Sequence, residues 1–349
     1  MKRKNDDFLR PRGKSLLTIV VGGFYGDEGK GKIVGCLATK RQYDYVVRAG
    51  GGPQAGHTVT DGKKVTQIPS GFIAPDAKLL IGRGTVINPD VVLREIETYG
   101  VGGRIGIDYG CTIIEGPKHI EQERELVERI GSVGTGTGPA RVDRLLRKAK
   151  IAKDIKALRP YLVDVAAEVN RAINLDKRIL VEGVQGYCLS LLNYKFYPYV
   201  TSQDTTASQF AVDVGIGPMA IDEVVVVYKA YVSRVGPGPM RFEWAKEQRD
   251  ARGTEERGTV SGRLRRLGDF DKNLAKESLS RNTGTHAAIT CIDRLFKGNA
   301  GVKEFDQLTK EAKDFIEKLN TLFKKASKYY RGIAAISTGP NLEDTILLV

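Results

Sequence analysis

A glycine-rich loop near the start of the chain carries residues suited to phosphate chemistry. In VVGGFYGDEGKGK (20–32) an apolar run ends in glycines that stand beside two acids and two lysines. A strand that leads through glycines into a helix presents backbone N–H groups to an anion. The standard phosphate loop reads GxxxxGK[ST], but here Gly23 precedes Gly29 by one residue too many and Gly31 replaces the hydroxyl residue. A carboxylate beside phosphates is costly unless it holds a metal or moves a proton, so Asp27 is a candidate for either task.

A second loop brings a histidine to the end of another apolar run. His57 lies near the end of RAGGGPQAGHT (48–58) and is one of only three histidines in the chain. A histidine flanked by glycines after a strand is well placed for proton transfer, although a lone histidine more often has a structural role. The residues alone leave both interpretations open. Lys30 of the first loop can neutralise a phosphate.

Two further loops carry hydroxyl and amide side chains. Ser132 lies in RIGSVGTGTGPAR (129–141), and Arg147 follows on a predicted helix. Gln185 ends an apolar run, and its amide, which both donates and accepts hydrogen bonds, suits the edge of a purine. Thr201 lies in a hydroxyl-rich turn.

Three late loops could bind carboxylates, phosphates or a base. GTVSGRLRR (258–266) sets Arg263 and Arg265 after a flexible turn, where a carboxylate or phosphate clamp is expected rather than a plain helix surface. TCID (290–293) and STGP (337–340) end two late apolar runs. An acid in such a place can accept the N1–H and N2–H groups of guanine.

Apolar runs of strand length must position these loops. They lie at 16–23, 43–50, 78–84, 178–183, 222–232, 287–293 and 332–338. Helical patterns lie between several of them, at 142–173 and 304–326. Strands nearly continuous in Val and Ile that alternate with helices predict an α/β fold, in which helices flank a mostly parallel central sheet.

The composition fits a globular protein with one large domain. The chain has 349 residues, of which 41% are hydrophobic and 28% charged, and no apolar run approaches the roughly 18 residues of a membrane span. Residues 1–15 are basic, without an apolar segment after them, and are predicted to be a flexible tail before a single domain at 16–349. The four cysteines form no CxxC pair, which favours a reducing cytoplasm over a zinc site or disulfides.

Two other classes of protein are considered. A kinase or GTPase with an ordinary phosphate loop would need Ser or Thr after Gly-Lys, where Gly31 stands. A nucleic-acid-binding protein would suit the net charge of +13, but the basic residues are spread along the chain and interleaved with acids. We therefore expect small anionic substrates, and neither nucleic acid nor a membrane as a partner.

The ordered set of motifs resembles the adenylosuccinate synthetase family. The family's GDEGKGK loop stands at 26–32, and its GGxNAGHT loop is similar to GGPQAGHT at 51–58. Its EGxQG and YPYVTS stretches are similar to EGVQG at 182–186 and YPYVTS at 197–202. The glycine-hydroxyl loop, the arginine loop and STGP follow the family order, and the length resembles that of the shorter archaeal members.

The resemblance implies a P-loop-like ligase fold and a reaction in two steps. GTP phosphorylates the 6-oxygen of IMP, and aspartate then displaces that phosphate to give adenylosuccinate. Asp27 would be the general base at N1 and a ligand of Mg²⁺, with the Gly56 carbonyl completing the metal site. His57 would be the general acid at O6 and at the γ-phosphoryl group.

The resemblance also implies the binding residues. The donor nucleotide would contact Gly26, Glu28, Gly29, Lys30, Gly31, Thr58, Asp293 and Gly339, with Asp293 selecting guanine. The purine monophosphate would contact Ser132, Arg147, Gln185 and Thr201, with Arg147 reaching in from the partner subunit of a homodimer. Aspartate would contact Ser261, Arg263 and Arg265.

Several positions depart from the family pattern, and they concern the nucleotides. Phe24 replaces a Gln that in the family lies near the substrate base, Val133 replaces a threonine of the phosphate loop, and Gln54 replaces an Asn. Leu264 interrupts the arginine run, and Cys291 replaces a lysine two residues before the guanine-selecting acid. Phe24 and Val133 are expected to make the monophosphate pocket less polar.

An alternative substrate therefore stays open. A phage branch of the family joins aspartate to dGMP, with ATP or dATP as donor, to make the precursor of 2-aminoadenine, and this chain shares its CLSLLNYKFYPY stretch (188–199). That branch often replaces the loop acid by a small hydroxyl residue, whereas Asp27 is retained here. IMP is the expected acceptor, and the enzyme is expected in the cytoplasm, or in the host cytoplasm if phage-encoded.

Overall fold

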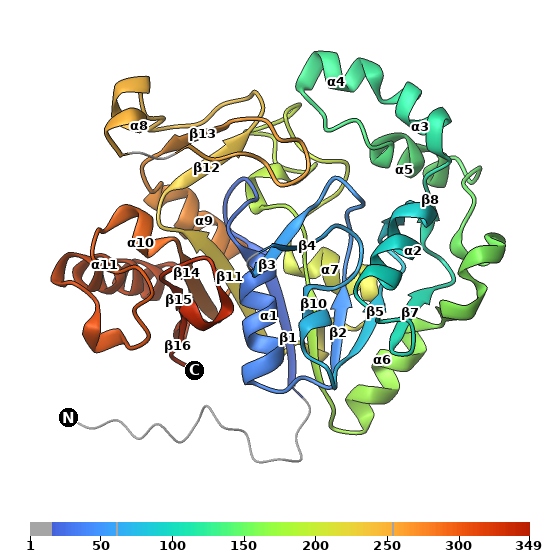
Figure 1. The fold of residues 1–349 in the computed structure, drawn as a ribbon, viewed down its shortest axis with the longest axis horizontal. Coiled ribbons are helices and arrows are strands. Elements are labelled where there is room, and N and C mark those ends of the chain that lie inside the picture. Colours follow the sequence, from blue (N-terminus) through green and yellow to red (C-terminus); the bar gives the residue numbers. More distant parts are fainter. Residues whose placement is uncertain (1–15, 61, 253–254) are drawn as a thin grey trace.

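The fold is built on a sheet of ten strands. The structure is a computed structural model that describes residues 16–60, 62–252 and 255–349 (Figure 1). Within this part of the chain the strand order is β16-β15-β14-β11-β1-β10-β2-β5-β7-β9, and all neighbours are parallel except β15 and β16. The strands are β1 (Leu16–Gly22), β2 (Tyr45–Arg48), β5 (Lys78–Ile81), β7 (Ile105–Asp108), β9 (Leu162–Val163), β10 (Arg178–Glu182), β11 (Glu223–Lys229), β14 (His286–Thr290), β15 (Gly332–Ser337) and β16 (Thr345–Leu347).

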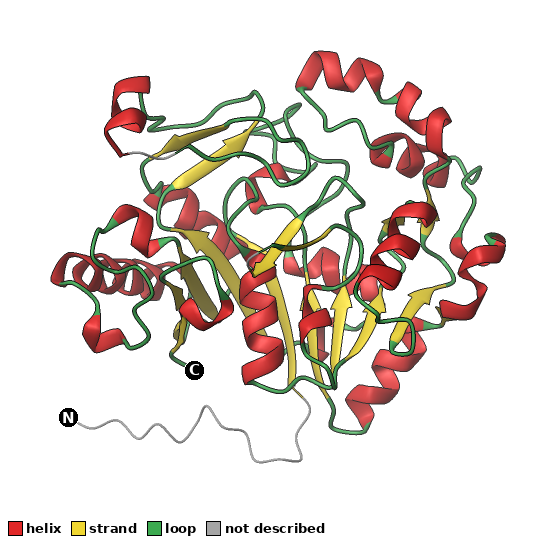
Figure 2. Ribbon diagram, viewed as in Figure 1, coloured by secondary structure: helices red, strands yellow, loops and turns green. Residues whose placement is uncertain are grey.

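Three short strand pairs lie outside the sheet, and helices surround it (Figure 2). The pairs are β3 (His57–Thr60) with β4 (Lys63–Val65), β6 (Val86–Ile87) with β8 (Thr112–Ile113), and β12 (Val232–Val235) with β13 (Arg265–Gly268). The helices are α1 (Lys30–Lys40), α2 (Pro89–Thr98), α3 (Gly116–Gln122), α4 (Arg124–Ile130), α5 (Thr137–Leu145), α6 (Val165–Asn174), α7 (Ala207–Val214), α8 (Lys246–Arg252), α9 (Lys272–Arg281), α10 (Ile292–Leu295) and α11 (Lys310–Ala326).

The central strand β1 explains why both faces of the sheet are covered. All seven of its residues are buried, and successive side chains point to opposite faces. Leu17, Ile19 and Val21 pack in a core with α6, α7, α9 and α11. Leu16 and Val20 pack in a second core with α1 and α2. A strand that is apolar on both faces must lie between two helical layers, which confirms the predicted mostly parallel sheet flanked by helices.

Each apolar run predicted as a strand forms one of the strands of this sheet. The helical pattern at 304–326 forms α11 over its greater part, and the Thr309 hydroxyl caps the helix by accepting from the N–H of Ala312. No helix among the described residues is long and apolar enough to cross a membrane. The predicted tail at 1–15 lies outside the described residues.

The prediction of one helical stretch at 142–173 is wrong over its middle. Helix α5 ends at Leu145, and Arg147 has a left-handed φ of 58°. Two 3₁₀ segments follow, and the second contains Pro160, which cannot donate a helical hydrogen bond. Strand β9 then pairs with β7 at the edge of the sheet before α6 begins. Helical periodicity alone did not reveal this edge strand.

Candidate active site

The carboxyl ends of the parallel strands open onto one cavity of about 450 Å³, which we call the central cavity. This edge is where open α/β sheets usually bind ligands. Sixteen of the predicted site residues line it: Gly26, Asp27, Gly29, Lys30, Gly31, Gly56, His57, Thr58, Ser132, Gln185, Thr201, Ser261, Arg263, Arg265, Asp293 and Gly339. Two predicted residues, Glu28 and Arg147, do not.

The loop after β1 is folded by its own glycines and by Glu28. Gly26 and Gly29 have φ angles of 85° and 82°, which glycine adopts without strain. The Glu28 carboxylate is buried and accepts hydrogen bonds from the backbone N–H groups of Phe24 (3.0 Å) and Gly26 (2.8 Å). It also pairs with Lys30 Nζ at 2.7 Å. The side chain of Glu28 therefore holds the loop together and does not face the cavity.

The close packing around Gly31 explains why no hydroxyl residue follows Lys30. A Cβ on Gly31 would lie 2.7 Å from the Cβ of His57 and 2.9 Å from the carbonyl oxygen of Thr58. The first turn of α1 thus packs directly on β3, and a serine or threonine does not fit. A metal at this loop would therefore need ligands other than a hydroxyl group at position 31.

Asp27 is paired with Arg265 across the cavity. Arg265 Nε lies 2.9 Å from Asp27 Oδ2, and Arg265 Nη2 lies 2.9 Å from Asp27 Oδ1. The two side chains therefore form a bidentate ion pair. Asp27 itself has a left-handed φ of 60°, an uncommon conformation for a residue with a side chain. The predicted base and a predicted aspartate-binding arginine are therefore in contact in this state.

His57 is held by two charged residues at neighbouring strand ends. Arg48 and Glu182 face one another in the register of β2 and β10, and Arg48 Nη1 donates to Glu182 Oε1 at 3.0 Å. His57 Nδ1 contacts the same carboxylate and also lies 2.6 Å from Arg48 Nη1, so Nδ1 is the ring nitrogen that faces this pair. Ser70 donates to Glu182 through its backbone N–H and its hydroxyl. Burial and the nearby Arg48 guanidinium lower the pKa of His57 to about 4, against the opposing influence of Glu182.

The arginine loop lies against the glycine-hydroxyl loop. Arg263 Nη2 donates to the carbonyl oxygen of Gly131 at 2.8 Å. The Ser132 hydroxyl, predicted to bind the monophosphate, donates to Glu123, which is buried. Ser261 Oγ accepts from the N–H of Arg263 at 3.3 Å. These contacts bring the predicted monophosphate and aspartate residues together at one side of the cavity.

The predicted donor-nucleotide residues meet at the ends of β14 and β15. Lys32 donates to the Ser337 hydroxyl and to the Gly339 carbonyl, and burial lowers the pKa of Lys32. Burial raises the pKa of Asp293, although Lys32 opposes this shift. The Thr290 hydroxyl donates to the Glu28 carbonyl at 2.7 Å, so this side of the cavity is tied to the first loop.

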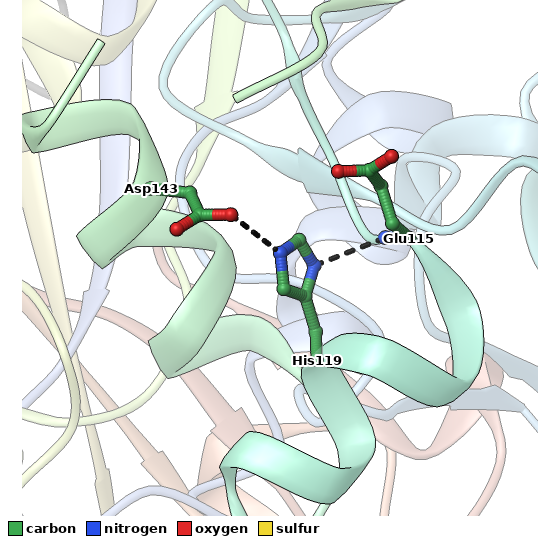
Figure 3. A group of neighbouring side chains, drawn as sticks. All are labelled: Glu115, His119 and Asp143. Atoms are coloured by element: carbon green, nitrogen blue, oxygen red, sulfur yellow. Dashed lines mark hydrogen bonds and ion pairs between the residues drawn. The ribbon is translucent and has the colours of Figure 1, made fainter. Parts of the chain in front are cut away.

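One group of described side chains outside the cavity has the composition of a metal site (Figure 3). Its members are Glu115, His119 and Asp143. His119 Nδ1 accepts from the Glu115 backbone N–H at 3.0 Å, and Nε2 lies 3.1 Å from Asp143 as a donor. Lys118 pairs with both carboxylates, at 3.3 Å for Glu115 and 2.7 Å for Asp143. Both ring nitrogens of His119 already make hydrogen bonds, and the Lys118 ammonium already neutralises the carboxylates. The group is therefore a structural link between α3 and α5.

One expectation about an individual residue needs correction. Phe24 is 1% exposed and packs edge-to-face on Tyr228 and Phe270, at centroid distances of 5.2 and 5.1 Å. It is therefore part of the core and does not make the monophosphate pocket less polar. Arg147 is exposed, and its Nη1 donates to the Leu145 carbonyl at 2.6 Å. It does not line the cavity of its own chain, and its predicted role at the cavity of a partner subunit stays a prediction.

The cavity also contains charged residues that the sequence did not single out. Lys229, Arg234, Glu256 and Arg294 line it, and the Arg48–Glu182 pair supports His57. Arg48 and Lys229 each end a buried apolar run, where a charged residue at the end of a parallel strand is a recognisable signal. Glu256 lies in a loop, and nothing in its sequence context distinguishes it from its neighbour Glu255.

Comparisons with known proteins identify the family of the chain. The sequence profile of the adenylosuccinate synthetase family matches residues 19–157 and 149–299. An adenylosuccinate synthetase of Archaeoglobus fulgidus is 50% identical over 335 residues, which are 94% of this chain and 97% of that protein. One of Methanocaldococcus jannaschii is 46% identical over 338 residues, which are 94% of this chain and 96% of that protein.

Solved structures are similar in fold. Fully ligated adenylosuccinate synthetase of Plasmodium falciparum has a TM-score of 0.86 at 23% identity, over 95% of this chain and 99% of that one. Cyanophage S-2L succinoaminodeoxyadenylate synthetase, bound to dGMP and dATP, has a TM-score of 0.79 at 21% identity, over 96% and 95% of the two chains. The family profile covers most of the chain and the archaeal relatives match nearly all of it, so the chain belongs to the adenylosuccinate synthetase family, whose members are ligases.

Proposed function

We propose that the enzyme joins L-aspartate to carbon 6 of IMP at the expense of GTP, giving adenylosuccinate, GDP and phosphate. The observation that carries this proposal is the meeting of Asp27, His57 and Lys30 at one cavity. Asp27 lies in the loop after β1, Lys30 begins α1 and His57 begins β3. The relatives at 46–50% identity bear the name of this activity. The reaction belongs to purine biosynthesis.

In the first step, Asp27 takes the proton from N1 of IMP, and O6 attacks the γ-phosphorus of the donor. The bond from that phosphorus to the β–γ bridging oxygen breaks, and GDP leaves. In the second step, the neutral aspartate amine attacks carbon 6, the bond from carbon 6 to O6 breaks, and phosphate leaves with O6. The attacking nitrogen gives its excess proton to solvent. Asp27 can act as the base only after Arg265 releases it, because both carboxylate oxygens are held by that guanidinium here.

His57 is proposed to donate a hydrogen bond to O6 and to the γ-phosphoryl group in flight. Glu182 fixes the Nδ1 side of the ring, so a proton for the substrate must be carried on Nε2. The pKa of His57 is about 4 in the present state, which favours the neutral ring. Anionic nucleotides beside the ring raise this pKa, because a nearby negative charge stabilises the imidazolium.

Mg²⁺ is proposed to bind between Asp27 and the Gly56 carbonyl. Both groups line the cavity beside the phosphate loop, and oxygen ligands of this kind suit magnesium. The bound ion would neutralise charge on the phosphates of the donor. Gly26, Gly29, Lys30, Gly31 and Thr58 would hold those phosphates.

The remaining residues are assigned by their place in the cavity. Asp293 and Gly339 would hold the guanine of the donor, and the Asp293 carboxylate can accept two N–H groups from it. Gln185 and Thr201 would hold the purine and its 5′-phosphate, together with Ser132. Ser261, Arg263 and Arg265 would hold aspartate, since two arginines beside a hydroxyl suit a dicarboxylate.

The enzyme is proposed to act as a homodimer in the cytoplasm. Arg147 is exposed, and within its own chain it does not line the cavity. In a dimer it could reach the 5′-phosphate site of the partner. The four cysteines are free, which suits a reducing compartment.

A matrix of substrates tests the proposal. IMP, GMP and dGMP are each combined with GTP, ATP and dATP in the presence of aspartate and Mg²⁺, and phosphate release is measured. We expect the highest kcat/KM for IMP with GTP and a product with the mass of adenylosuccinate. Turnover of dGMP without turnover of IMP would instead assign the chain to the reaction of the phage enzymes.

A further inference from the structure

Glu256 is a buried carboxylate at the wall of the central cavity with an unusual number of partners. It is 5% exposed, and it accepts hydrogen bonds from Lys229 Nζ and from the Tyr231 hydroxyl. Arg265 Nη1 donates to it at 2.9 Å and Arg294 Nη1 at 3.1 Å. Four side chains from three segments thus converge on one carboxylate.

The charges around Glu256 keep it ionised. Burial alone would raise its pKa, but the neighbouring Lys229, Tyr231 and Arg265 lower the pKa to about 2. Three cationic side chains face this one anion, so the group as a whole keeps a positive charge. A positive wall suits a cavity whose substrates are anions.

The contact with Arg265 links Glu256 to the reacting groups. A guanidinium is planar, and each of its edges presents donors in a fixed direction. Nη1 of Arg265 points to Glu256, and the edge formed by Nε and Nη2 points to Asp27. The backbone adds a further restraint, because the Arg265 N–H donates to the Glu256 carbonyl at 2.8 Å. Glu256 therefore holds one nitrogen of the guanidinium, and the edge formed by Nε and Nη2 is left for Asp27.

We propose that Glu256 is a positioning residue of the ligase reaction, which holds Arg265 by one nitrogen so that its other edge serves Asp27 first and the substrate aspartate later. The free edge of Arg265 can hold only one carboxylate in a bidentate pair at a time. When a carboxylate of aspartate takes this edge, Asp27 is released for the metal and for N1. The role toward aspartate rests on the proposed function, whereas the role toward Asp27 rests on the contacts alone.

Kinetics of the variant Glu256→Gln test the proposal. The glutamine amide keeps the shape of the Glu256 side chain but loses its negative charge. Its NH₂ group would face the N–H donors that now bind the carboxylate. We expect the aspartate KM to rise by about tenfold or more, which is the effect of losing a charge-assisted hydrogen bond, with the KM of the purine monophosphate within about threefold of the parent. Glu256→Asp keeps the charge and should give an intermediate aspartate KM. If Glu256→Gln fails to fold, Glu256→Asp alone must still raise the aspartate KM.

A matched control separates positioning from stability. Glu223 is also 5% exposed and paired with an arginine, Arg41, but it lies at the opposite end of β11 from Lys229. Glu223→Gln should lower the melting temperature without changing the aspartate KM. Equal effects of the two variants on the aspartate KM would overturn the proposal.

A crystal structure of Glu256→Gln gives a readout that does not depend on turnover. We expect Arg265 to leave Asp27 or to pair with it through a different edge. An unchanged bidentate pair at the parent distance would overturn the proposal, whatever the activity. If the parent enzyme does not use aspartate and IMP, the proposed function is wrong. The position of Arg265 in the Glu256→Gln structure then still shows whether Glu256 positions Arg265 toward Asp27.

Discussion

Asp27 has a strained backbone conformation, and its side chain is the proposed base at N1 and a proposed ligand of Mg²⁺. Its φ of 60° is rare for a residue with a Cβ, and such conformations persist where the surroundings impose them. Gly26 before it, Gly29 two residues after it and the hydrogen bonds of Glu28 impose it here. As a result the carboxylate points across the cavity to Arg265.

We predict that Asp27→Asn lowers kcat by about 10²-fold or more, because the amide can neither take the N1 proton nor bind a metal as an anion. Nucleotide binding measured by calorimetry should stay within about tenfold of the parent, since the backbone donors of the loop remain. Asp176→Asn is the matched control, because Asp176 also has a left-handed φ, of 55°, and does not line the cavity. An Asp27→Asn enzyme with parental kcat would show that the base has been assigned wrongly.

Sequence patterns predicted residues that belong to a local motif and missed residues that depend on register. Asp27, Lys30 and His57 belong to glycine-rich stretches whose composition suggests their chemistry. Glu182 and Arg48 support His57 only because β10 and β2 are neighbours in the sheet with these residues aligned. Strand order cannot be read from a single sequence, so this network could not be derived before the fold was known.

At the scale of elements, the contact between α1 and β3 fixes the distance between the two catalytic loops. Gly31 stands at this contact, where a Cβ would meet backbone and Cβ atoms and not the flexible end of a side chain. Neither element can give way easily, since α1 is buried along its first turns and His57 is held by Glu182.

We predict that Gly31→Ala lowers the free energy of unfolding by about 1–3 kcal/mol, the usual cost of overpacking, and lowers kcat as well, because it separates His57 from the phosphate loop. The control is Gly103→Ala, where no atom lies within 4 Å of the added Cβ. Urea denaturation and steady-state kinetics measure the two effects. Loss of stability without loss of kcat would mean that the spacing of the loops is not critical.

The elements also show the limits of pattern recognition. Most strands buried on both faces are rich in Val and Ile and are predicted from the sequence, because burial dictates their composition. Strand β7 is an exception: all four of its residues are buried, but its short sequence IGID is not predicted. The edge strand β9 has only two residues and was lost within a helical pattern. The β12–β13 pair, which places Arg265 opposite Asp27, was likewise not predicted, since its arginines do not alternate as in a typical strand.

At the scale of the whole molecule, buried histidines link stability to pH. Burial lowers the pKa of His57 and of His286 to about 4, against 6.5 for an unperturbed histidine. Between these values the unfolded chain binds more protons than the folded one, so stability falls as the pH falls from about 6.5 to about 4. Glu182 and Glu256, with pKa values lowered to about 2 against 4.5, extend the loss to lower pH.

We predict that the free energy of unfolding decreases by about 1.4 kcal/mol per pH unit for each of the two histidines between pH 6 and pH 4.5. Urea denaturation at several pH values measures this slope. His286→Gln should reduce the slope by about 1.4 kcal/mol per pH unit, the contribution of one histidine, and His57→Gln should reduce it by the same amount. The assignment of these groups is wrong if neither substitution changes the slope.

The proposed dimer predicts complementation between two inactive variants. Asp27 lines the cavity of its own chain, whereas Arg147 would serve the cavity of the partner. Arg147→Leu should therefore be nearly inactive at low IMP concentration, because the 5′-phosphate loses a charged partner, and Asp27→Asn should be inactive for lack of a base.

When the two variants are mixed and allowed to exchange subunits, half of the dimers become mixed. Each mixed dimer has one cavity that carries both substitutions and one that carries neither, so about a quarter of the parental activity should return. The measurement is phosphate release before and after exchange, with each variant alone as control. If Arg147 acts within its own chain, every cavity in a mixed dimer carries one substitution, and no activity returns.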